Sequence, residues 1–380
     1  MTEKLFDKDS HIKEFTAQVL SCETENGSFK ILLDKTAFFY EGGGQPSDKG
    51  TLDNANVLDV QSVDGEIYHY TDKPLAIGAT VTGVLDWETR YDRMQNHSGE
   101  HIISGIVHSL YGLDNVGFHL SDETVTLDFD GILDEEQLSY VEKLANQVVW
   151  RNSAFKAYYP DENTLEKLDY RSKKELNGDI RIVEIEDCDI CACCAPHVKS
   201  AGEIGMIKLL DTEKMRGGTR IFIKCGKRAL EDYGKRYKSM LSLSSLMSVK
   251  QFEILDGAKK LYEQIASSKF ENTTLKKRLI NSLINTCSKE DNAVFEDGLD
   301  IKELGIFADG LYKKLGGIRA VFSKLSQDTY SFAICGDSEK LNIMFADFKT
   351  DFSVRGGGRN GMVQGTVEGT EEKLKLYFKN

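Results

Sequence analysis

Short hydrophobic runs separated by turn residues occupy the first quarter of the chain. Between Phe15 and Val84, runs such as FKILLD, NVLDVQSV and TVTGVLD alternate apolar and polar positions, with glycine, asparagine or aspartate between them. A period of two residues is typical of strands with one buried face, and closely spaced short strands favour an antiparallel sheet or a small barrel. The pattern therefore predicts a β-barrel-like region over residues 1–90.

The period of the hydrophobic pattern changes after this region. Residues Met94–Leu110 have a helical pattern, and Asp134 with Gln137 forms a capping-box signature that opens another helix. The run ETVTLDFDG between them reads as a strand, as do MIKLLD and TRIFIKCG further on. We therefore expect an α+β domain over residues 91–226.

A long helical pattern follows over residues 227–290. Ser248 and Gln251 have the spacing of another capping box. Beyond them, apolar residues recur at the three- and four-residue intervals of a buried helical stripe, which predicts a helical hairpin or short coiled coil. These residues are Ile254, Ala258, Leu261, Ile265, Leu275, Leu279 and Leu283.

The last part of the chain mixes both patterns. A helix near Lys302–Lys314 alternates with the strand-like runs IRAVFSKL, SFAICG, NIMFAD and LKLYFK. This make-up predicts a small α/β domain over residues 291–380. The whole chain is accordingly expected to be α+β, with a helical or coiled-coil linker between its two mixed parts.

Composition and charge restrict the compartment and the partners. The start, MTEKLFDKDSHIKEF, is acidic where a signal peptide would be basic and then apolar, and no run is long and apolar enough for a membrane span. A cytoplasmic protein is therefore expected. The net charge is -13, but between Lys214 and Met240 nine basic residues face two acidic ones, a local +7. This stretch is a candidate polyanion-binding surface, with a solvated helix face as the alternative.

Two pairs of side chains have the spacing of metal ligands. His97 and His101 are four residues apart in a predicted helix, so both rings project from one face. Cys193 and His197 repeat this spacing within DCDICACCAPHVKSAGEIG. Three histidines and one cysteine can hold Zn²⁺ tetrahedrally, and three such ligands with an open position would make the site catalytic.

Two other interpretations of these residues stay open. HSGEH fits the H-x-x-E-H pattern of one class of zinc metallopeptidases, in which His97 and His101 bind the metal and Glu100 activates water. That interpretation needs a further carboxylate ligand downstream. The other is an all-cysteine zinc site, for which adjacent cysteines are awkwardly spaced. It would use Cys188, Cys191, Cys193 and Cys194.

Three separated motifs resemble those of a known family. TAFFYEGGGQPSDKG over Thr36–Gly50, then RMQNHSGEHII, then CCAPHVKSAGEIG, resemble in this order the editing domain of alanyl-tRNA synthetases and the freestanding alanyl-tRNA editing proteins. RGGGRNGMVQGT near the end is similar to the glycine-rich signature of their DHH-associated domain. The resemblance covers almost the whole chain. It implies a zinc-containing catalytic editing domain over residues 91–226 and a DHH-associated domain over residues 291–380.

The chain departs from the family motifs at two places. The family tyrosine of the first motif is here Phe39, with Tyr40 one place later. The usual Gly-Gly-Thr between the metal-binding cysteine and histidine is Cys194, Ala195 and Pro196. The spacing of the four metal ligands is kept.

The resemblance implies a zinc-dependent aminoacyl-tRNA deacylase that removes serine, with glycine as a second candidate, from mischarged tRNA-Ala. Hydrolysis of this activated ester needs a positioned water and a polarised carbonyl. Gly43 and Gly44 can bring backbone N–H groups to the ester, and Gln45 can hydrogen-bond it. Thr36 could bond a serine hydroxyl that alanine lacks.

The basic glycine loop near the C-terminus is the second candidate for tRNA contact. Arg355 and Arg359 flank three glycines, a pattern suited to gripping phosphate, with a plain turn as the alternative. A homodimer through the helical region or the C-terminal domain is a further expectation. A non-catalytic tRNA-binding module is the rival function from another class.

Overall fold

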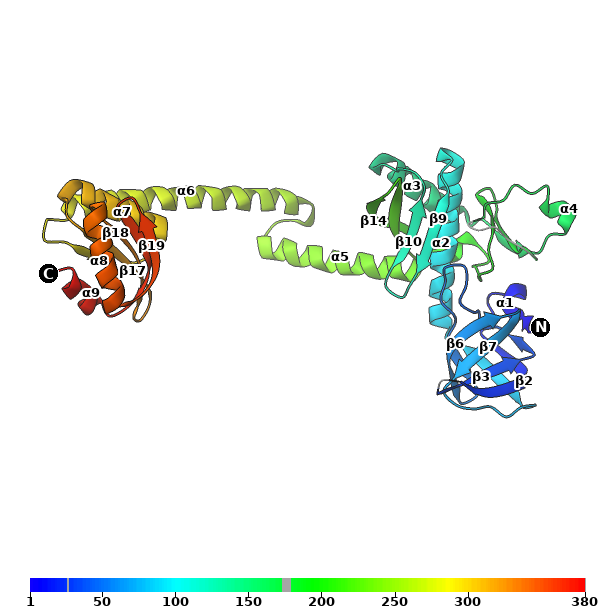
Figure 1. Cartoon of the computed structure of the whole chain (residues 1–380). Helices are drawn as coiled ribbons and strands as arrows, with labels where there is room; N and C mark the ends of the chain where they lie inside the picture. Colours follow the sequence, from blue (N-terminus) through cyan, green and yellow to red (C-terminus); the bar gives the residue numbers. More distant parts are fainter. Residues whose placement is uncertain (26, 173–178, 380) are drawn as a thin grey trace. The chain divides into compact units, whose positions relative to one another are not determined.

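The computed structural model describes residues 1–25, 27–172 and 179–379, and the chain divides into two compact units, Met1–Met240 and Leu241–Asn380 (Figure 1). Helices and sheets occur in both units, so the α+β class predicted from the sequence is confirmed. Among the described residues, no helix has both the length and the apolar character needed to cross a membrane. Each unit is described separately below.

Six antiparallel strands close into a barrel near the N-terminus. Their order around the barrel is β2-β3-β7-β6-β5-β8, and the ring closes because β8 also pairs with β2. Alternate residues of β2 face the core, as the period of two requires. The strands are β2 (Glu14–Glu25), β3 (Ser28–Leu33), β5 (Gly50–Leu52), β6 (Ala55–Val63), β7 (Glu66–Thr71) and β8 (Thr80–Leu85). Beside them lie β1 (Glu3–Lys4), α1 (Leu5–Lys8) and β4 (Lys35–Thr36), of which β1 and β4 pair in parallel.

Helix α2 (Trp87–Tyr111) leads from the barrel into the mixed part of the first unit. It begins about two turns before the predicted start at Met94, because the Asp86 side chain accepts a hydrogen bond from the Thr89 amide and caps it. It ends at Gly112, whose φ of 64° suits a left-handed C-cap. Within the helix, a Cβ at Gly105 would lie 2.7 Å from the Cys188 carbonyl oxygen, so this glycine allows close packing.

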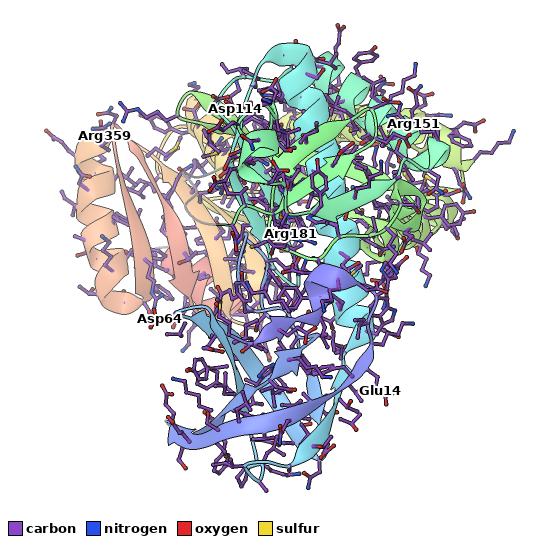
Figure 2. All side chains as sticks on the ribbon, turned by 90° about the vertical axis from the view of Figure 1, so that its right-hand side faces the viewer. Glu14, Asp64, Asp114, Arg151, Arg181 and Arg359 are labelled. Atoms are coloured by element: carbon purple, nitrogen blue, oxygen red, sulfur yellow. The ribbon has the colours of Figure 1, made fainter. Side chains whose placement is uncertain are left out.

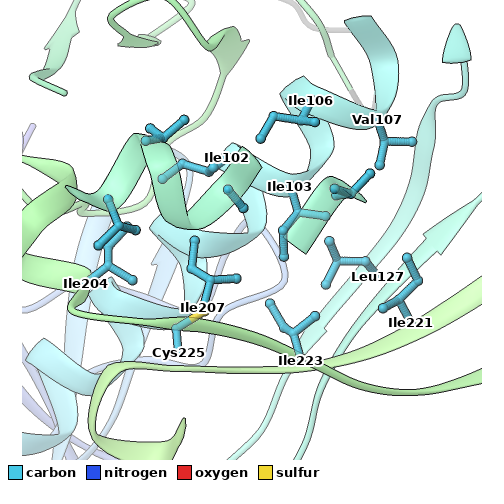
Figure 3. Close-up of a cluster of buried hydrophobic side chains, with 14 of the residues drawn as sticks. Ile102, Ile103, Ile106, Val107, Leu127, Ile204, Ile207, Ile221, Ile223 and Cys225 are labelled. Carbon is cyan, nitrogen blue, oxygen red and sulfur yellow. The ribbon is translucent and has the colours of Figure 1, made fainter. Parts of the chain in front are cut away.

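A four-stranded sheet packs against α2 and α3. Its order is β14-β15-β10-β9, and the shared core contains Ile103 of α2 and Leu127 of β10 (Figure 3). The predicted capping box of Asp134 and Gln137 is present at the start of α3. The elements are β9 (Asn115–Leu120), β10 (Val125–Phe129), α3 (Glu135–Arg151), β14 (Ile207–Met215) and β15 (Gly218–Cys225).

A small antiparallel sheet completes the first unit and carries the second metal-ligand motif at its end. Its strands have the order β11-β12-β13. The remaining elements of this unit are β11 (Phe155–Tyr158), α4 (Glu162–Leu165), β12 (Ile182–Ile185), β13 (Asp189–Ala192) and the 3-10 helix η1 (Ala201–Ile204). Helix α5 (Gly226–Met247) begins in this unit and continues past its boundary.

The second unit contains a five-stranded sheet of order β16-β17-β18-β20-β19. The predicted long helical pattern forms α6, and the helix predicted near Lys302–Lys314 is α7. The elements are η2 (Gln251–Glu253), α6 (Ile254–Thr286), β16 (Ala293–Phe295), α7 (Ile301–Leu315), β17 (Arg319–Ser326), β18 (Thr329–Cys335), α8 (Ser338–Asp351), β19 (Ser353–Arg359), β20 (Met362–Glu368) and α9 (Glu371–Tyr377). The finer four-part division of the chain stays a prediction.

Two of the predicted strands in this unit are helices. NIMFAD lies within α8, and the first four residues of LKLYFK form the end of α9. The Asp337 side chain caps α8 by accepting from the Glu339 and Lys340 amides, and Phe345 and Phe348 bury one face. A short apolar run shows neither a clear helical period nor a clear strand period. The conformation of NIMFAD is therefore set by a residue outside the run, the helix cap Asp337.

Two further local predictions are wrong. Ser248 does not cap a helix, because α5 ends at Met247 and Ser248 has a φ of 54° in the turn that follows. The run around Gly356 is not a loop but the edge strand β19, where Gly356 lies opposite Gly365. A side chain at Gly356 would collide with the Gln364 carbonyl, so glycine permits this close strand pairing.

Candidate metal centre and cavity

The two predicted ligand pairs meet in one cluster. Ligand atoms of His97, His101, Cys193 and His197 all lie within 4.8 Å of one another. The Cys193 Sγ is 3.4 Å from the His197 Nε2 and 3.6 Å from the His97 Nε2. A tetrahedral Zn²⁺ with ordinary bond lengths separates sulfur and nitrogen ligands by about 3.6 Å. The donor set and its spacing therefore fit zinc.

Each histidine of the cluster has a polar partner for its other ring nitrogen. The Nδ1 of His97 lies 3.0 Å from the Gln45 Oε1, and that of His197 lies 3.0 Å from the Ser98 Oγ. The Nδ1 of His101 lies 3.4 Å from an oxygen of Asp189. Such partners fix the tautomer and the orientation of ligating imidazoles, leaving the Nε2 atoms for a metal.

Asp189 is itself held in its charged form. The Arg171 Nε and Nη2 donate to its two oxygens over 2.8 Å and 2.7 Å. Burial would raise the pKa of Asp189, but the nearby His101 ring and the Arg171 guanidinium outweigh it and lower the pKa below its usual range. Asp189 also groups with His101 and Cys191 as a second possible ligand set. Because Arg171 already neutralises Asp189, we interpret this carboxylate as the support of His101.

The all-cysteine alternative lacks geometric support. Within residues 1–25, 27–172 and 179–379, no candidate metal group combines several cysteines. Burial, followed by the charge of Asp189, raises the pKa of Cys188 to about 12. The Cys188 Sγ instead donates a weak hydrogen bond to the Ile102 carbonyl oxygen of α2 over 3.8 Å.

Glu100 lies next to the histidines, and its carboxylate is fully buried. One oxygen accepts hydrogen bonds from the Ser104 hydroxyl over 2.7 Å and the Asn115 amide over 2.6 Å. The other oxygen is 3.9 Å from the Nε2 of both His97 and His101. Glu100 does not belong to the wall of the cavity that opens onto the cluster, whereas a water-activating base has to reach the substrate.

A cavity of about 570 Å³ opens onto the cluster, with His97, His101 and Cys193 in its wall. Other groups of its wall are Asp7, Tyr40, Gly43, Gly44, Tyr159 and Arg181. Burial, and then the neighbouring thiol of Cys194, raises the pKa of Tyr40 above its ordinary value. Burial and the carboxylate of Asp7 do the same for Tyr159. Both phenols therefore remain hydrogen-bond donors at neutral pH.

The predicted glycine loop forms a tight turn at this cavity. Gly42 and Gln45 exchange backbone hydrogen bonds of 3.1 Å and 3.0 Å, and the central residues Gly43 and Gly44 have φ of 62° and 81°. Positive φ at both central positions defines a type I′ turn and favours glycine. The turn docks on β9, since a Cβ at Gly44 would lie 2.6 Å from the Phe118 carbonyl oxygen.

Two predicted substrate-contacting residues are buried and do not belong to the cavity wall. Gln45 is 1% exposed, and its Oε1 faces His97. Thr36 is fully buried, with its Oγ1 2.8 Å from the His69 Nε2, and it also accepts a hydrogen bond from the Phe38 amide. Neither residue belongs to the wall of the cavity. The role of Thr36 in selectivity stays a prediction.

Five of the nine basic residues between Lys214 and Met240 form ion pairs with neighbouring carboxylates. Arg228, for example, pairs with Asp92 over 2.6 Å. The paired basic residues are Arg220, Lys224, Lys227, Arg228 and Arg236. Arg355 and Arg359 are exposed on β19 of the second unit.

Comparison with known proteins agrees with these motifs. Residues 180–222 match the family described as the threonyl and alanyl tRNA synthetase second additional domain, and residues 5–89 match class II (A) tRNA synthetases. The alanyl-tRNA editing protein Aarsd1-A of Xenopus laevis is 30% identical over 76% of this chain and 74% of its own length. The chain belongs to the alanyl-tRNA editing family.

Two other relatives are a further editing protein and a tRNA ligase. The Aarsd1 editing protein of Rattus norvegicus is 32% identical over 68% of this chain and 67% of its own length. The alanine–tRNA ligase of Ignicoccus hospitalis is 30% identical over 100% of this chain. The chain spans only 42% of that ligase.

The sequence patterns did not predict the residues that hydrogen-bond or pair with the side chains of the cluster. Ser98 directly follows His97, and Asp189 lies four residues before Cys193, but neither position has a distinctive spacing of its own. Arg171 and Asn115 lie further away along the chain. A search for polar residues on the buried face of α2 could have found Ser98, because a polar side chain there needs a hydrogen-bond partner.

Proposed function

We propose that the chain is a trans-editing hydrolase that deacylates mischarged tRNA-Ala, with Ser-tRNA-Ala as the main substrate and Gly-tRNA-Ala as the second candidate. The observation that supports this function is the three-histidine, one-cysteine cluster in the wall of a cavity. The cavity volume of about 570 Å³ is within the range of roughly 300–1,000 Å³ usual for small-molecule sites. It can therefore take an amino acid esterified to a terminal ribose.

The proposed metal ligands are His97, His101, Cys193 and His197. A bound Zn²⁺ would supply a Lewis acid that orients the ester or lowers the pKa of the attacking water. The chain contributes the fixed ring orientations described above. Gln45 acts in this proposal as a positioning residue, because its Oε1 holds the Nδ1 of His97.

The glycine turn is proposed to bind the reacting end of the substrate. Gly43 and Gly44 line the cavity, and their lack of side chains lets the ester approach the backbone closely. Backbone N–H groups at such a turn can stabilise the negative charge that develops on the carbonyl oxygen during hydrolysis. Two hydrogen bonds within the turn and the close packing of Gly44 against Phe118 hold this backbone in place.

Binding of the tRNA body is assigned to the second unit in this proposal. Arg355 and Arg359 lie on an exposed edge strand, where guanidinium groups can reach phosphate oxygens in pairs. The alternating strand geometry puts two residues four apart on the same face of the strand. Their role is positioning on RNA, separate from the hydrolysis.

The experiment that tests this function is deacylation of tRNA-Ala charged with serine, glycine or alanine. We expect rapid hydrolysis of the serine ester, little hydrolysis of the alanine ester, and no cleavage of casein or model peptides. Peptide cleavage without deacylation would instead support a metallopeptidase that uses Glu100. Binding of charged tRNA without hydrolysis would support a non-catalytic tRNA-binding module.

A further inference from the structure

We propose that Arg181 is the positioning residue of the metal ligand Cys193, an inference that rests on the proposed zinc site. The three histidine ligands each have a second ring nitrogen that a neighbour holds. A cysteine side chain carries only the sulfur that binds the metal. The place of its thiolate must therefore be set by the backbone around it.

Arg181 forms hydrogen bonds with the backbone of Cys193 and of Ala195. Its Nη1 donates to the carbonyl oxygens of Cys193 over 3.0 Å and Ala195 over 2.9 Å. In the opposite direction, the Cys193 amide donates to the Arg181 carbonyl over 3.0 Å. The intervening loop ends in Pro196, which has no N–H to donate. One guanidinium thus fixes the loop that links the ligands Cys193 and His197.

The N-terminal segment holds Arg181 in turn. The Arg181 Nε lies 3.2 Å from an oxygen of Asp7 on α1, and the Tyr159 hydroxyl donates to the other Asp7 oxygen over 2.9 Å. Arg181 is only 6% exposed, and Figure 2 marks it where the strands of this unit approach the N-terminal segment. A buried charge is stable only when paired and hydrogen-bonded, which all these contacts achieve.

The same three residues line the cavity beside the cluster. A ligand in the cavity therefore touches the groups that hold the Cys193 loop. Arg181 cannot be replaced by lysine without loss, because a single ammonium group does not have the planar fork of a guanidinium. Residues that orient metal ligands typically contribute 10- to 100-fold, in order of magnitude, to metal affinity.

The experiment measures zinc affinity of the full chain by competition with a chelator, using the metal alone as the probe. We expect Arg181→Lys to bind Zn²⁺ roughly 10- to 100-fold more weakly than the wild type. The matched control is Arg319→Lys in the second unit. Arg319 is also buried, at 4% exposed, and its Nε donates to the Gly316 carbonyl over 2.7 Å. That variant should lose stability but keep wild-type zinc affinity.

The outcomes separate this inference from the proposed function. A wild-type chain that binds no zinc contradicts the metal site itself. A wild-type chain that binds zinc, beside an Arg181→Lys variant of equal affinity, overturns only the role of Arg181. If Arg181→Lys does not fold, Asp7→Asn replaces it, since it keeps the guanidinium but removes its charged partner. We expect a several-fold loss of zinc affinity in Asp7→Asn, and unchanged affinity there also overturns the inference.

Discussion

Helices α2 and α7 bury very different side chains. Helix α7 covers its sheet with an apolar stripe, and its buried residues are Leu304, Gly305, Phe307, Ala308 and Leu311. Helix α2 buries a long series of polar side chains as well. These are Arg90, Arg93, Gln95, Asn96, His97, Ser98, Glu100, His101 and Ser104. Burying polar groups costs free energy unless each finds a partner.

The partners of the polar side chains on α2 come from distant parts of the chain. Asn96 accepts from the Cys225 amide, and Arg90 pairs with Asp48 of the barrel. His97 of the cluster bonds Gln45, and Ser98 bonds His197 of the cluster. Helix α7 therefore stabilises its domain by burying apolar side chains. Helix α2 instead buries polar side chains whose hydrogen bonds surround the His/Cys cluster. The following substitutions test this difference.

The largest expected effect is the loss of metal from His101→Ala. Removing one of four ligands should reduce zinc from one ion per chain to nearly none, and slow deacylation of Ser-tRNA-Ala by roughly 100-fold or more. Metal analysis of the purified protein measures this. Cys188→Ser is the control and should keep its zinc. The all-cysteine site would be correct if the cysteine variant lost the metal and the histidine variant kept it.

The converse test is Phe307→Ala on α7. Phe307 is fully buried, so the cavity left by its ring should lower the free energy of unfolding by about 3–5 kcal/mol. Zinc content should not change, because α7 carries no ligand. Ile306→Ala, at a side chain that is 49% exposed, should change the stability by about 0.5 kcal/mol or less. Urea unfolding measures the stability of both variants. Loss of zinc in Phe307→Ala would contradict the proposed difference between α2 and α7.

The sequence predicted the four clustered side chains better than their surroundings. This cluster could be found because His97 and Cys193 each begin a four-residue spacing, a local property that folding preserves. Asp189 and Arg171 support the site through contacts between distant segments, and no local spacing records such contacts. The same limit explains the fold. The strands of the barrel could be predicted because their period of two is local. The run NIMFAD was wrongly predicted as a strand, because its helix depends on the cap at Asp337, which lies outside the run.

A smaller effect is expected from Thr36→Val. The Thr36 hydroxyl lies 2.8 Å from the His69 Nε2 inside the barrel, so valine leaves a buried ring nitrogen with one partner fewer. The expected loss of unfolding free energy is about 1–3 kcal/mol. Because this hydroxyl lies outside the cavity wall, we expect the ratio of Ser-tRNA-Ala to Ala-tRNA-Ala hydrolysis to stay near that of the wild type. A fall of this ratio, with zinc retained, would support the sequence-based role of Thr36 in selectivity.

The smallest expected effect concerns RNA binding by the second unit. If Arg355 and Arg359 each contact one phosphate, replacing both with glutamine should raise KM for charged tRNA a few-fold and leave kcat unchanged. The slope of log affinity against log salt should become shallower by roughly 1.5–2, because binding no longer releases the counterions of the two lost phosphate contacts. The matched control replaces Lys302 and Lys340, two exposed lysines of the same unit, with glutamine. It makes the same change in net charge. Equal effects of the two double variants would mean that only net charge matters, and that the edge strand β19 is not a binding surface.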